Sequence, residues 1–283
     1  MTKPELEVLP AGQRGLALAL DWAAEEGWNP GLNDARCFYA ADSTGFFIAE
    51  LGDEPVGFIS SVAYGPAFGF LGLYLVRPDF RARGIGLRLW QHASDYLGHR
   101  AVGLDGVPAQ QANYEKSGFR GSHGNIRFRV FGGSGSDPSS AEIIDIEAVS
   151  FEEVAAFDRK VFGAPREGFL REWLTQRGAA SLAALEDGQL AGYGVLRPCR
   201  VGFKIGPLFA REDLVAEALF DALATRAEGE HVYIDVPEAN AAAMAFAQKR
   251  GLEPVFHTAR MYKGRPPAPD VYPVFGVTSL ELG

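Results

Sequence analysis

The chain has 283 residues, a length typical of two domains, and its hydrophobic fraction of 47% is that of an ordinary globular protein. Its net charge of −9 and pI near 5.1 argue against nucleic acid or an anionic membrane as the main partner. The chain has only two cysteines, its first residues carry no apolar signal region, and no apolar run is long enough to span a bilayer. We therefore expect a cytoplasmic protein with reduced thiols.

The first half predicts an alternation of strands and helices. Apolar patterning and turn residues indicate a strand over 6–9, helices over 13–26 and 34–41, strands over 46–51, 56–64 and 68–76, a helix from Gly84, a strand over 101–104, a helix opened by Pro108 and closed by Gly118, and a strand over 126–131. Three consecutive strands in the middle are typical of an antiparallel meander. The expected class is α/β (α+β), with a mixed, mostly antiparallel sheet flanked by helices.

The turn after the third of these meander strands carries the first candidate site. The apolar strand ends at Val76, and the pattern Arg81-x-x-Gly84-x-Gly86 leads into the next helix. The first N–H groups of a helix have no intrahelical partner, and the helix dipole adds partial positive charge there. A phosphate fits such a place, with Arg81 and Arg83 adding charge at the rim. Alternatively, the glycines serve only tight packing of a strand–turn–helix unit.

This stretch resembles motif A of the GNAT acyltransferases (the N-acetyltransferase superfamily), in which (Arg/Gln)-x-x-Gly-x-(Gly/Ala) binds the pyrophosphate of acetyl-CoA. The sequence matches every fixed position of that motif. The resemblance implies that acetyl-CoA is a cosubstrate and that its pantetheine lies between the splayed strands 68–76 and 101–105. The implied CoA-binding residues are Leu75, Val76, Arg81, Ala82, Arg83, Gly84, Ile85 and Gly86.

A second motif follows at residues 113–119, Asn-Tyr-Glu-Lys-Ser-Gly-Phe, which resembles the end of GNAT motif B. The resemblance implies that Tyr114 is the general acid that protonates the departing CoA thiolate. The alternative is a core tyrosine on a helix that ends at a C′ glycine. Many GNATs have an asparagine eleven residues before that glycine, where this chain has Val107. Gln110, Gln111 or Asn113 can substitute, and Asn113 is included among the candidate CoA contacts.

An amine acceptor must lose a proton before or during attack, so we sought a base. Glu26, Asp105 and Glu50 are candidates, either as the base or as members of a water chain. Asp105 follows a central strand, but it can equally cap the next helix. Trp28 and Asn29, in the turn after the first helix, can shape the acceptor pocket or serve as a turn with a core tryptophan.

The second half repeats the order of elements in the first. Residues 132–140, Gly-Gly-Ser-Gly-Ser-Asp-Pro-Ser-Ser, indicate a flexible linker between domains over 1–131 and 141–283. After it we expect a strand over 143–146, two helices within 150–177, strands over 182–186, 190–196 and 201–210, a helix, a strand over 232–236, a helix over 239–250 closed by Gly251, and a strand over 256–262.

The site residues of the first half are not repeated in the second. After Ala210 the chain enters its helix through Arg211-Glu212-Asp213, and acidic residues at a helix N-terminus repel a pyrophosphate. Ala247 occupies the position of the acid, whereas Asn240, eleven residues before Gly251, is present. The whole order resembles a two-domain, YitH-type GNAT subgroup. We therefore expect a catalytic first domain and a degenerate GNAT-like second domain without a CoA site.

The resemblance implies an N-acyltransferase that moves acetyl from acetyl-CoA to the primary amine of a small molecule by direct attack in a ternary complex. Two alternatives remain open: a protein lysine or N-terminal acetyltransferase, and a catalytically silent acyl-CoA-binding sensor. The five histidines show no metal-ligand spacing, and Cys37 has no catalytic partner in sequence, so we expect no metal and a buried thiol. No nucleic-acid or membrane partner is expected, and the protein is a monomer or a homodimer.

Overall fold

The computed structural model describes residues 4–133, 141–267 and 273–283. The first half contains β1 (Leu6–Pro10), α1 (Gly12–Glu25), α2 (Asp34–Ala41), β2 (Phe46–Leu51), β3 (Glu54–Tyr64), β4 (Phe68–Val76), α3 (Ile85–Leu97), β5 (Ala101–Gly106), α4 (Gln111–Lys116) and β6 (Arg120–Phe131). Short 3-10 helices at Pro78–Phe80 and Pro108–Gln110 precede α3 and α4. The predicted helix from Pro108 is thus a 3-10 turn followed by a short α-helix.

The second half contains β7 (Glu142–Asp145), α5 (Phe151–Phe162), α6 (Glu167–Leu174), β8 (Ala180–Glu186), β9 (Gln189–Pro198), β10 (Phe203–Ala210), α7 (Asp213–Ala224), β11 (His231–Pro237), α8 (Ala241–Lys249), β12 (Glu253–Lys263) and β13 (Val274–Gly276). Two further 3-10 turns lie at Ile146–Ala148 and Thr225–Ala227. The elements follow the predicted order, except that the sequence did not predict β13. Most of the predicted linker, residues 134–140, lies outside the described residues.

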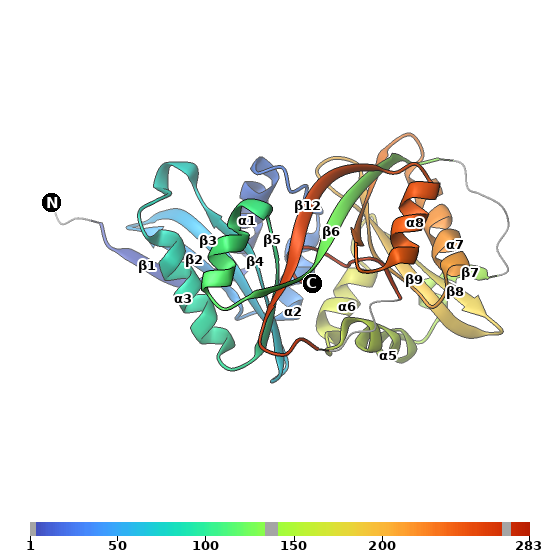
Figure 1. Cartoon of the computed structure of the whole chain (residues 1–283), viewed down its shortest axis with the longest axis horizontal. Helices are drawn as coiled ribbons and strands as arrows, with labels where there is room; N and C mark the ends of the chain where they lie inside the picture. Colours follow the sequence, from blue (N-terminus) through green and yellow to red (C-terminus); the bar gives the residue numbers. More distant parts are fainter. Residues whose placement is uncertain (1–3, 134–140, 268–272) are drawn as a thin grey trace.

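The strands of both halves form one continuous mixed sheet, with the order β1-β2-β3-β4-β5-β12-β6-β11-β10-β9-β8-β7 (Figure 1). Among the strands of the described residues, the β4–β5 and β10–β11 ladders are parallel and the others are antiparallel. Helices cover both faces, so the predicted class of mixed, mostly antiparallel sheet with flanking helices is confirmed. No helix in the described part of the chain has the length and apolar character needed to cross a bilayer.

The core has three parts. One cluster lies between the sheet and α3, and a second lies between the sheet and α7 with α8. The third runs along the other face and joins the halves through α1, α2, α5 and α6. Within it, Phe38 of α2 stacks on Trp173 of α6, with ring centroids 6.1 Å apart. Cys37 is also buried there, and burial raises the pKa of its thiol to about 12, so the prediction of a buried thiol is confirmed.

The two halves exchange their last long strands. β12 lies between β5 and β6, and β6 pairs with β11, so each strand enters the sheet of the other half. Figure 1 shows the two strands crossing the middle of the molecule side by side. The predicted domain limits divide the sequence at 132–140, whereas the sheet is shared across that division.

Each exchanged strand is held by a buried Arg–Asp pair. Arg260 of β12 lies directly opposite Asp105 of β5 in the ladder and donates to both carboxylate oxygens, at 2.8 and 2.7 Å. Arg127 of β6 lies opposite Asp235 of β11 and does the same at 2.7 and 2.9 Å. Each pair joins an exchanged strand to a strand of the other half, and a guanidinium left buried without its carboxylate is strongly destabilising.

Candidate functional site: a cavity shared by the two halves

The parallel ladder between β4 and β5 opens part-way along. Pairing ends at Leu71↔Leu104, although β4 continues to Val76 and β5 continues to Gly106. The predicted splaying of these strands is therefore confirmed. A cavity of about 510 Å³ begins in this opening and extends to the turn before α3. Its lining includes residues of both halves, with Phe256, Thr258, Leu280 and Glu281 from the second.

The turn before α3 has the backbone of an anion cradle. Ala82 and Gly84 both have positive φ, at +61° and +81°, and Gly84 is the N-cap of α3. The first intrahelical bond runs from Arg88 N to Gly84 O, so the N–H groups before it have no partner within the helix. A Cβ at Gly84 would meet nothing within 4 Å, so it is the left-handed backbone that favours glycine here. These features fit a phosphate-bearing cosubstrate.

Gly86 is needed for a different reason. A Cβ at this position would lie 2.5 Å from the hydroxyl of Tyr74, which reaches across from β4. Tyr74 in turn packs against Trp90 of α3, with ring centroids 5.6 Å apart. Gly86 therefore leaves room for Tyr74, which lines the cavity. At this position the glycine serves tight packing, as the alternative interpretation of the motif predicted.

Arg81 is bound within the protein. Its Nε donates to the backbone oxygen of Val76 at 2.9 Å, and its Nη2 pairs with the carboxylate of Glu26. Both side chains line the cavity and are partly exposed. The carboxylate of Glu26 thus lies beside the cradle at the start of α3, and an incoming phosphate would compete with it for the guanidinium.

A strand bulge lies deeper in the cavity. The register between β3 and β4 shifts between Phe58 and Ser60, and Leu73 has a positive φ of 43° on the bulged strand. A bulge leaves one residue out of the ladder and re-aims its backbone groups. Here the bulge lies where β4 separates from β5, and Gly72, Leu73 and Tyr74 all line the cavity.

Tyr114 lines the same cavity, from α4. Its ring stacks on Trp90 at 5.4 Å and lies edge-on to Phe119. A Cβ at Gly106 would lie 2.6 Å from this ring, so β5 must have glycine there for the tyrosine to approach. Burial raises the pKa of Tyr114, and nearby Tyr74 raises it further. The phenol therefore retains its proton at neutral pH and can donate it.

Asp105 also lines the cavity, but its carboxylate is fully engaged. Arg260 donates to both oxygens, and Asn125 Nδ2 donates to Oδ1 at 2.8 Å. Its side chain is buried, and it makes no cap to the following helix. Burial raises the pKa of Asp105, while the Arg260 guanidinium opposes that shift. Asp105 joins β12 to β5, and each of its two oxygens already accepts a hydrogen bond from Arg260.

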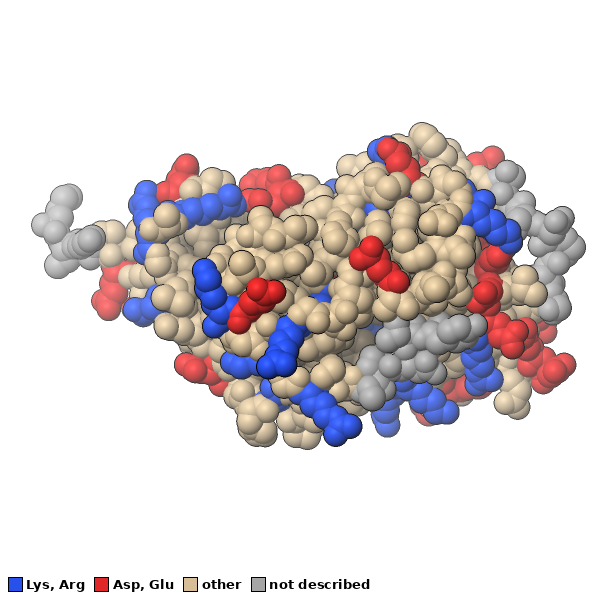
Figure 2. Space-filling view, viewed as in Figure 1, with Lys and Arg blue, Asp and Glu red and all other residues tan. Residues whose placement is uncertain are grey.

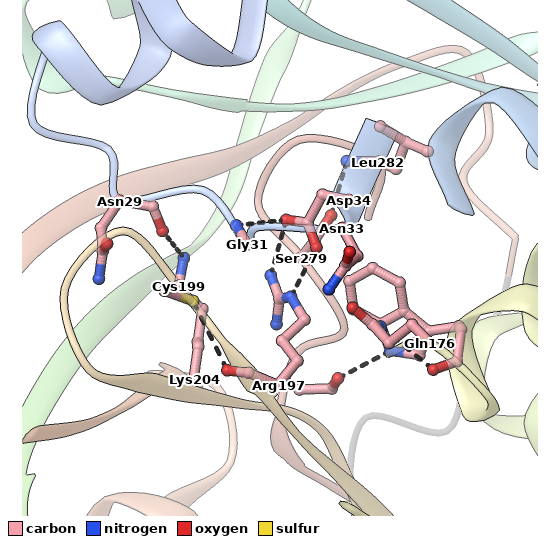
Figure 3. A network of polar contacts seen from close by, with 12 residues as sticks. Asn29, Gly31, Asn33, Asp34, Gln176, Arg197, Cys199, Lys204, Ser279 and Leu282 are labelled. Carbon is pink, nitrogen blue, oxygen red and sulfur yellow. Dashed lines mark hydrogen bonds and ion pairs between the residues drawn. The ribbon is translucent and has the colours of Figure 1, made fainter. Parts of the chain in front are cut away.

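The turn that carries Trp28 is held by the exchanged strand β6 and by residues of the second half, and Figure 3 shows the surroundings of Asn29 in this turn. Arg127 Nη1 donates to Trp28 O at 2.6 Å, and Lys204 Nζ donates to Asn29 O at 3.0 Å. The side chain of Asn29 exchanges two hydrogen bonds with the backbone of Val201. Behind the turn, buried Arg197 pairs with Asp34, which also accepts from Gly31 N at 2.7 Å. The position of Trp28 therefore depends on contacts between the halves.

The predicted site residues divide into two groups. Those that line the cavity are Glu26, Trp28, Leu75, Val76, Arg81, Ala82, Gly84, Ile85, Gly86, Asp105 and Tyr114. Arg83, Asn29 and Asn113 do not line it: Arg83 stacks on Phe80, and Asn113 Nδ2 donates to Gln110 Oε1 at 2.9 Å. The candidate base Glu50, on β2, lies outside it as well.

Sequence reasoning missed the part of the lining that the second half contributes. Phe256 and Thr258 lie on the exchanged strand β12, and Leu280 and Glu281 follow β13. No local pattern links these positions to a motif more than 150 residues earlier. Among the described residues, no group of three or more His, Cys, Asp or Glu side chains could hold a metal ion.

Family models agree with this geometry. The model of the Acetyltransferase (GNAT) family matches residues 13–119, and that of an Acetyltransferase (GNAT) domain matches residues 154–276. The holothin acyltransferase of Pseudoalteromonas sp. (strain SANK 73390) is 34% identical over 275 residues, which cover 97% of this chain and 93% of that protein. The chain belongs to the GNAT acyltransferase family. It is an enzyme of the acyltransferase class with tandem GNAT domains, in a family that generally uses acetyl-CoA.

Other proteins are similar to this tandem GNAT acyltransferase in sequence or in structure. The uncharacterized N-acetyltransferase YitH of Bacillus subtilis (strain 168) is 26% identical over 174 residues, covering 59% of this chain and 60% of that protein. A putative acetyltransferase from Pyrococcus horikoshii has a TM-score of 0.84 at 20% identity, over 100% of this chain and 98% of that one. A tandem GNAT protein from the clavulanic acid biosynthesis pathway has a TM-score of 0.64 at 18% identity, over 93% and 100%. These two structural likenesses support the fold.

Proposed function

We propose that this protein transfers an acetyl group from acetyl-CoA to the primary amine of a small molecule. The observation that carries the proposal is the position of the Tyr114 side chain, which lines the same cavity as the glycine turn before α3 and the opening between β4 and β5. An anion cradle, a strand-edge backbone and a protonated phenol within one cavity are the groups that acyl transfer from a CoA thioester requires.

In this proposal each group has a separate task. The cradle at Ala82–Gly86 binds the pyrophosphate, and the exposed backbone near Leu75 and Val76 pairs with the pantetheine. A backbone N–H at the β4 bulge polarises the thioester carbonyl. The amine nitrogen bonds to the carbonyl carbon, the C–S bond breaks, and Tyr114 gives its proton to the departing sulfur. Binding both substrates in one cavity removes much of the entropic barrier to their reaction.

The apolar lining that both halves contribute supports a small acceptor. Trp28 from the first half and Phe256 and Leu280 from the second line the cavity, and the turn of Trp28 is held by hydrogen bonds from Arg127 and Lys204. The 34% identical relative is named as an acyltransferase for holothin, which fits an acceptor other than a polypeptide. On the face in Figure 2, acidic and basic side chains are interspersed, without a broad basic surface among the described residues of that face.

The test is a screen of amines with acetyl-CoA and longer acyl-CoAs, following free thiol release and identifying amides by mass spectrometry. We expect acetyl transfer to small primary amines, at rates above that of thioester hydrolysis. A panel of lysine peptides and free N-terminal peptides serves as the comparison. Faster transfer to those peptides, or hydrolysis without amide formation for every amine, would contradict the proposal.

A further inference from the structure

The segment that follows β13 places a carboxylate inside the cavity. Residues 277–283 leave the second half and pack against β4, where a Cβ on Gly72 would lie only 1.9 Å from the backbone oxygen of Glu281. Tyr64 donates to Leu282 O at 2.9 Å and holds the segment there. Gly72 immediately precedes the bulge at Leu73, so Glu281 lies at the point where β4 separates from β5.

The Glu281 side chain is buried without a protein partner for one of its oxygens. It is 5% exposed and lines the cavity, and its Oε2 accepts no hydrogen bond from any described residue. Thr258 of β12 lines the same cavity, is 2% exposed, and has an Oγ1 that likewise lacks a partner among the described residues. Buried polar atoms are normally hydrogen-bonded, so two such atoms in the lining of one cavity indicate a polar ligand there.

The other carboxylates near the cavity have protein partners. Asp105 is bound by Arg260 and Asn125, and Glu26 is paired with Arg81. Around Glu281, the cations within electrostatic reach are Arg127 of β6, Arg197 of β9 and Lys204 of β10. Arg127 and Arg197 are occupied by Asp235 and Asp34, and Lys204 by Asn29 O. None of these cations donates to Oε2 of Glu281, so this oxygen stays open to a ligand.

Resting on the proposed N-acylation, we propose that Glu281 is the general base that receives the proton of the acceptor amine, and that Thr258 helps to orient that amine. As the nitrogen bonds to the acyl carbon, one N–H proton passes to a carboxylate oxygen of Glu281, while Tyr114 protonates the sulfur. The products are the amide and the CoA thiol, and solvent returns the proton from Glu281 to Tyr114. The aromatic and aliphatic wall of Trp28, Phe256 and Leu280 assigns to the acceptor an apolar body beside its amine.

The test compares wild type, E281Q, E281D and the control E253Q, which removes an exposed carboxylate on β12 away from the cavity. Each variant is assayed with strongly basic alkylamines and with weakly basic arylamines, and its acetyl-CoA affinity is measured by calorimetry. We expect E281Q to lower kcat/KM for alkylamines by about 10²- to 10³-fold and for arylamines by under about tenfold, because the latter are already neutral and need less help in losing a proton. E281D should recover part of the rate, and T258V should raise KM several-fold.

Unchanged acetyl-CoA affinity shows that a variant is folded, and only then is its rate interpreted; E281D provides the second measurement if E281Q does not fold. If E281Q loses kcat/KM equally for both amine classes, or keeps full activity with alkylamines, Glu281 is not the general base. The proposed N-acylation stands in that case, because wild type still acylates amines. If wild type binds acetyl-CoA but acylates no amine, the proposed function fails, and the role of Glu281 fails with it.

Discussion

The two halves share one arrangement of strands and helices but differ at the point where a GNAT domain would bind its cosubstrate. In the first half the parallel ladder opens beyond Leu71 and leaves a cavity. In the second half the β10–β11 ladder also stops early, at Ile205↔Ile234, but β13 fills the opening. β13 pairs with β10, and Val277 N donates to Asp235 O of β11 at 2.8 Å. β13 thus lies in the second half at the place where the first half has its cavity.

The second half also lacks the glycine turn and the tyrosine that line the cavity of the first half. α7 begins at Asp213 with Glu212 as its N-cap, and no glycine turn precedes it. Ala247 is fully buried in the core under α8 at the position equivalent to Tyr114. Asn240 is kept as a helix cap: its Oδ1 accepts from Ala242 N and Ala243 N. The second half therefore keeps the fold without the site residues of the first. Core packing and helix capping require different residues from those that bind a cosubstrate.

The largest effect should come from breaking the pairs that hold the exchanged strands. Asp105→Ala leaves Arg260 buried without its carboxylate, which should lower the free energy of unfolding by about 3–5 kcal/mol. Asp235→Ala should lower the free energy of unfolding by a similar amount, because it leaves Arg127 buried without its carboxylate partner. Urea unfolding of both variants measures these costs. If either variant unfolds at the wild-type urea midpoint, its pair does not secure the exchange.

Removing the acid separates chemistry from binding in the first half. Tyr114→Phe keeps the ring that stacks on Trp90 but deletes the proton donor, so kcat should fall by about 10²- to 10³-fold with an unchanged Kd for acetyl-CoA. Tyr39→Phe, which deletes a hydroxyl outside the cavity, is the matched control and should retain full turnover. A Tyr114→Phe enzyme as fast as wild type would remove the tyrosine from the mechanism.

Restoring the acid to the second half should not restore a site. Ala247 is completely buried, so Ala247→Tyr overfills the core and should destabilise the protein by about 1–3 kcal/mol. Because β13 still fills the β10–β11 opening, calorimetry should show the same number of acetyl-CoA molecules bound per chain as in wild type. A newly gained binding event would show that the tyrosine alone distinguishes the halves.

Two glycines with matching backbone allow a direct test of the cradle. Gly84 and Gly188 both have positive φ, at +81° and +73°, and neither would bring a Cβ within 4 Å of another atom. Alanine costs roughly 1–2 kcal/mol in this region of φ, so both substitutions strain a turn. Only Gly84→Ala should weaken acetyl-CoA binding, by up to about tenfold in Kd. Equal affinities for the two variants in calorimetry would argue against the cradle at Gly84.

The effect that is smallest at neutral pH concerns His123 on β6, one of the exchanged strands. Burial, with the nearby charge of Arg260, lowers the pKa of His123 on β6 to about 4. Between pH 6.5 and 4 the unfolded chain binds a proton at this histidine that the folded chain does not, so stability should fall as pH falls. The slope from this one group is at most about 1.4 kcal/mol per pH unit.

His123→Gln should flatten that part of the pH profile, measured by thermal melting between pH 4 and 7. The control is His257→Gln, which alters an exposed histidine on the other exchanged strand, β12. If the melting temperatures of the two variants depend on pH in the same way, His123 does not cause the loss of stability at low pH.

The sequence by itself determined the family, the order of the elements and most of the first-half cavity lining. These features are local: a glycine turn, a helix start, an apolar strand and a tyrosine four residues before a helix-ending glycine each lie within a short window. Their physical causes, such as positive φ at Gly84 and unpaired N–H groups at a helix start, act over the same short range. The division of the chain at 132–140 stays a prediction.

Only the tertiary structure decided how the halves combine. Exchange of β6 and β12, filling of the second site by β13 and entry of Glu281 into the first site all join segments that are far apart in sequence. Such contacts leave no periodic signal, because a strand has the same pattern beside either neighbour. The buried pairs of Asp105 with Arg260 and of Asp235 with Arg127 join residues 155 and 108 positions apart, so they become evident only when the sheet is assembled.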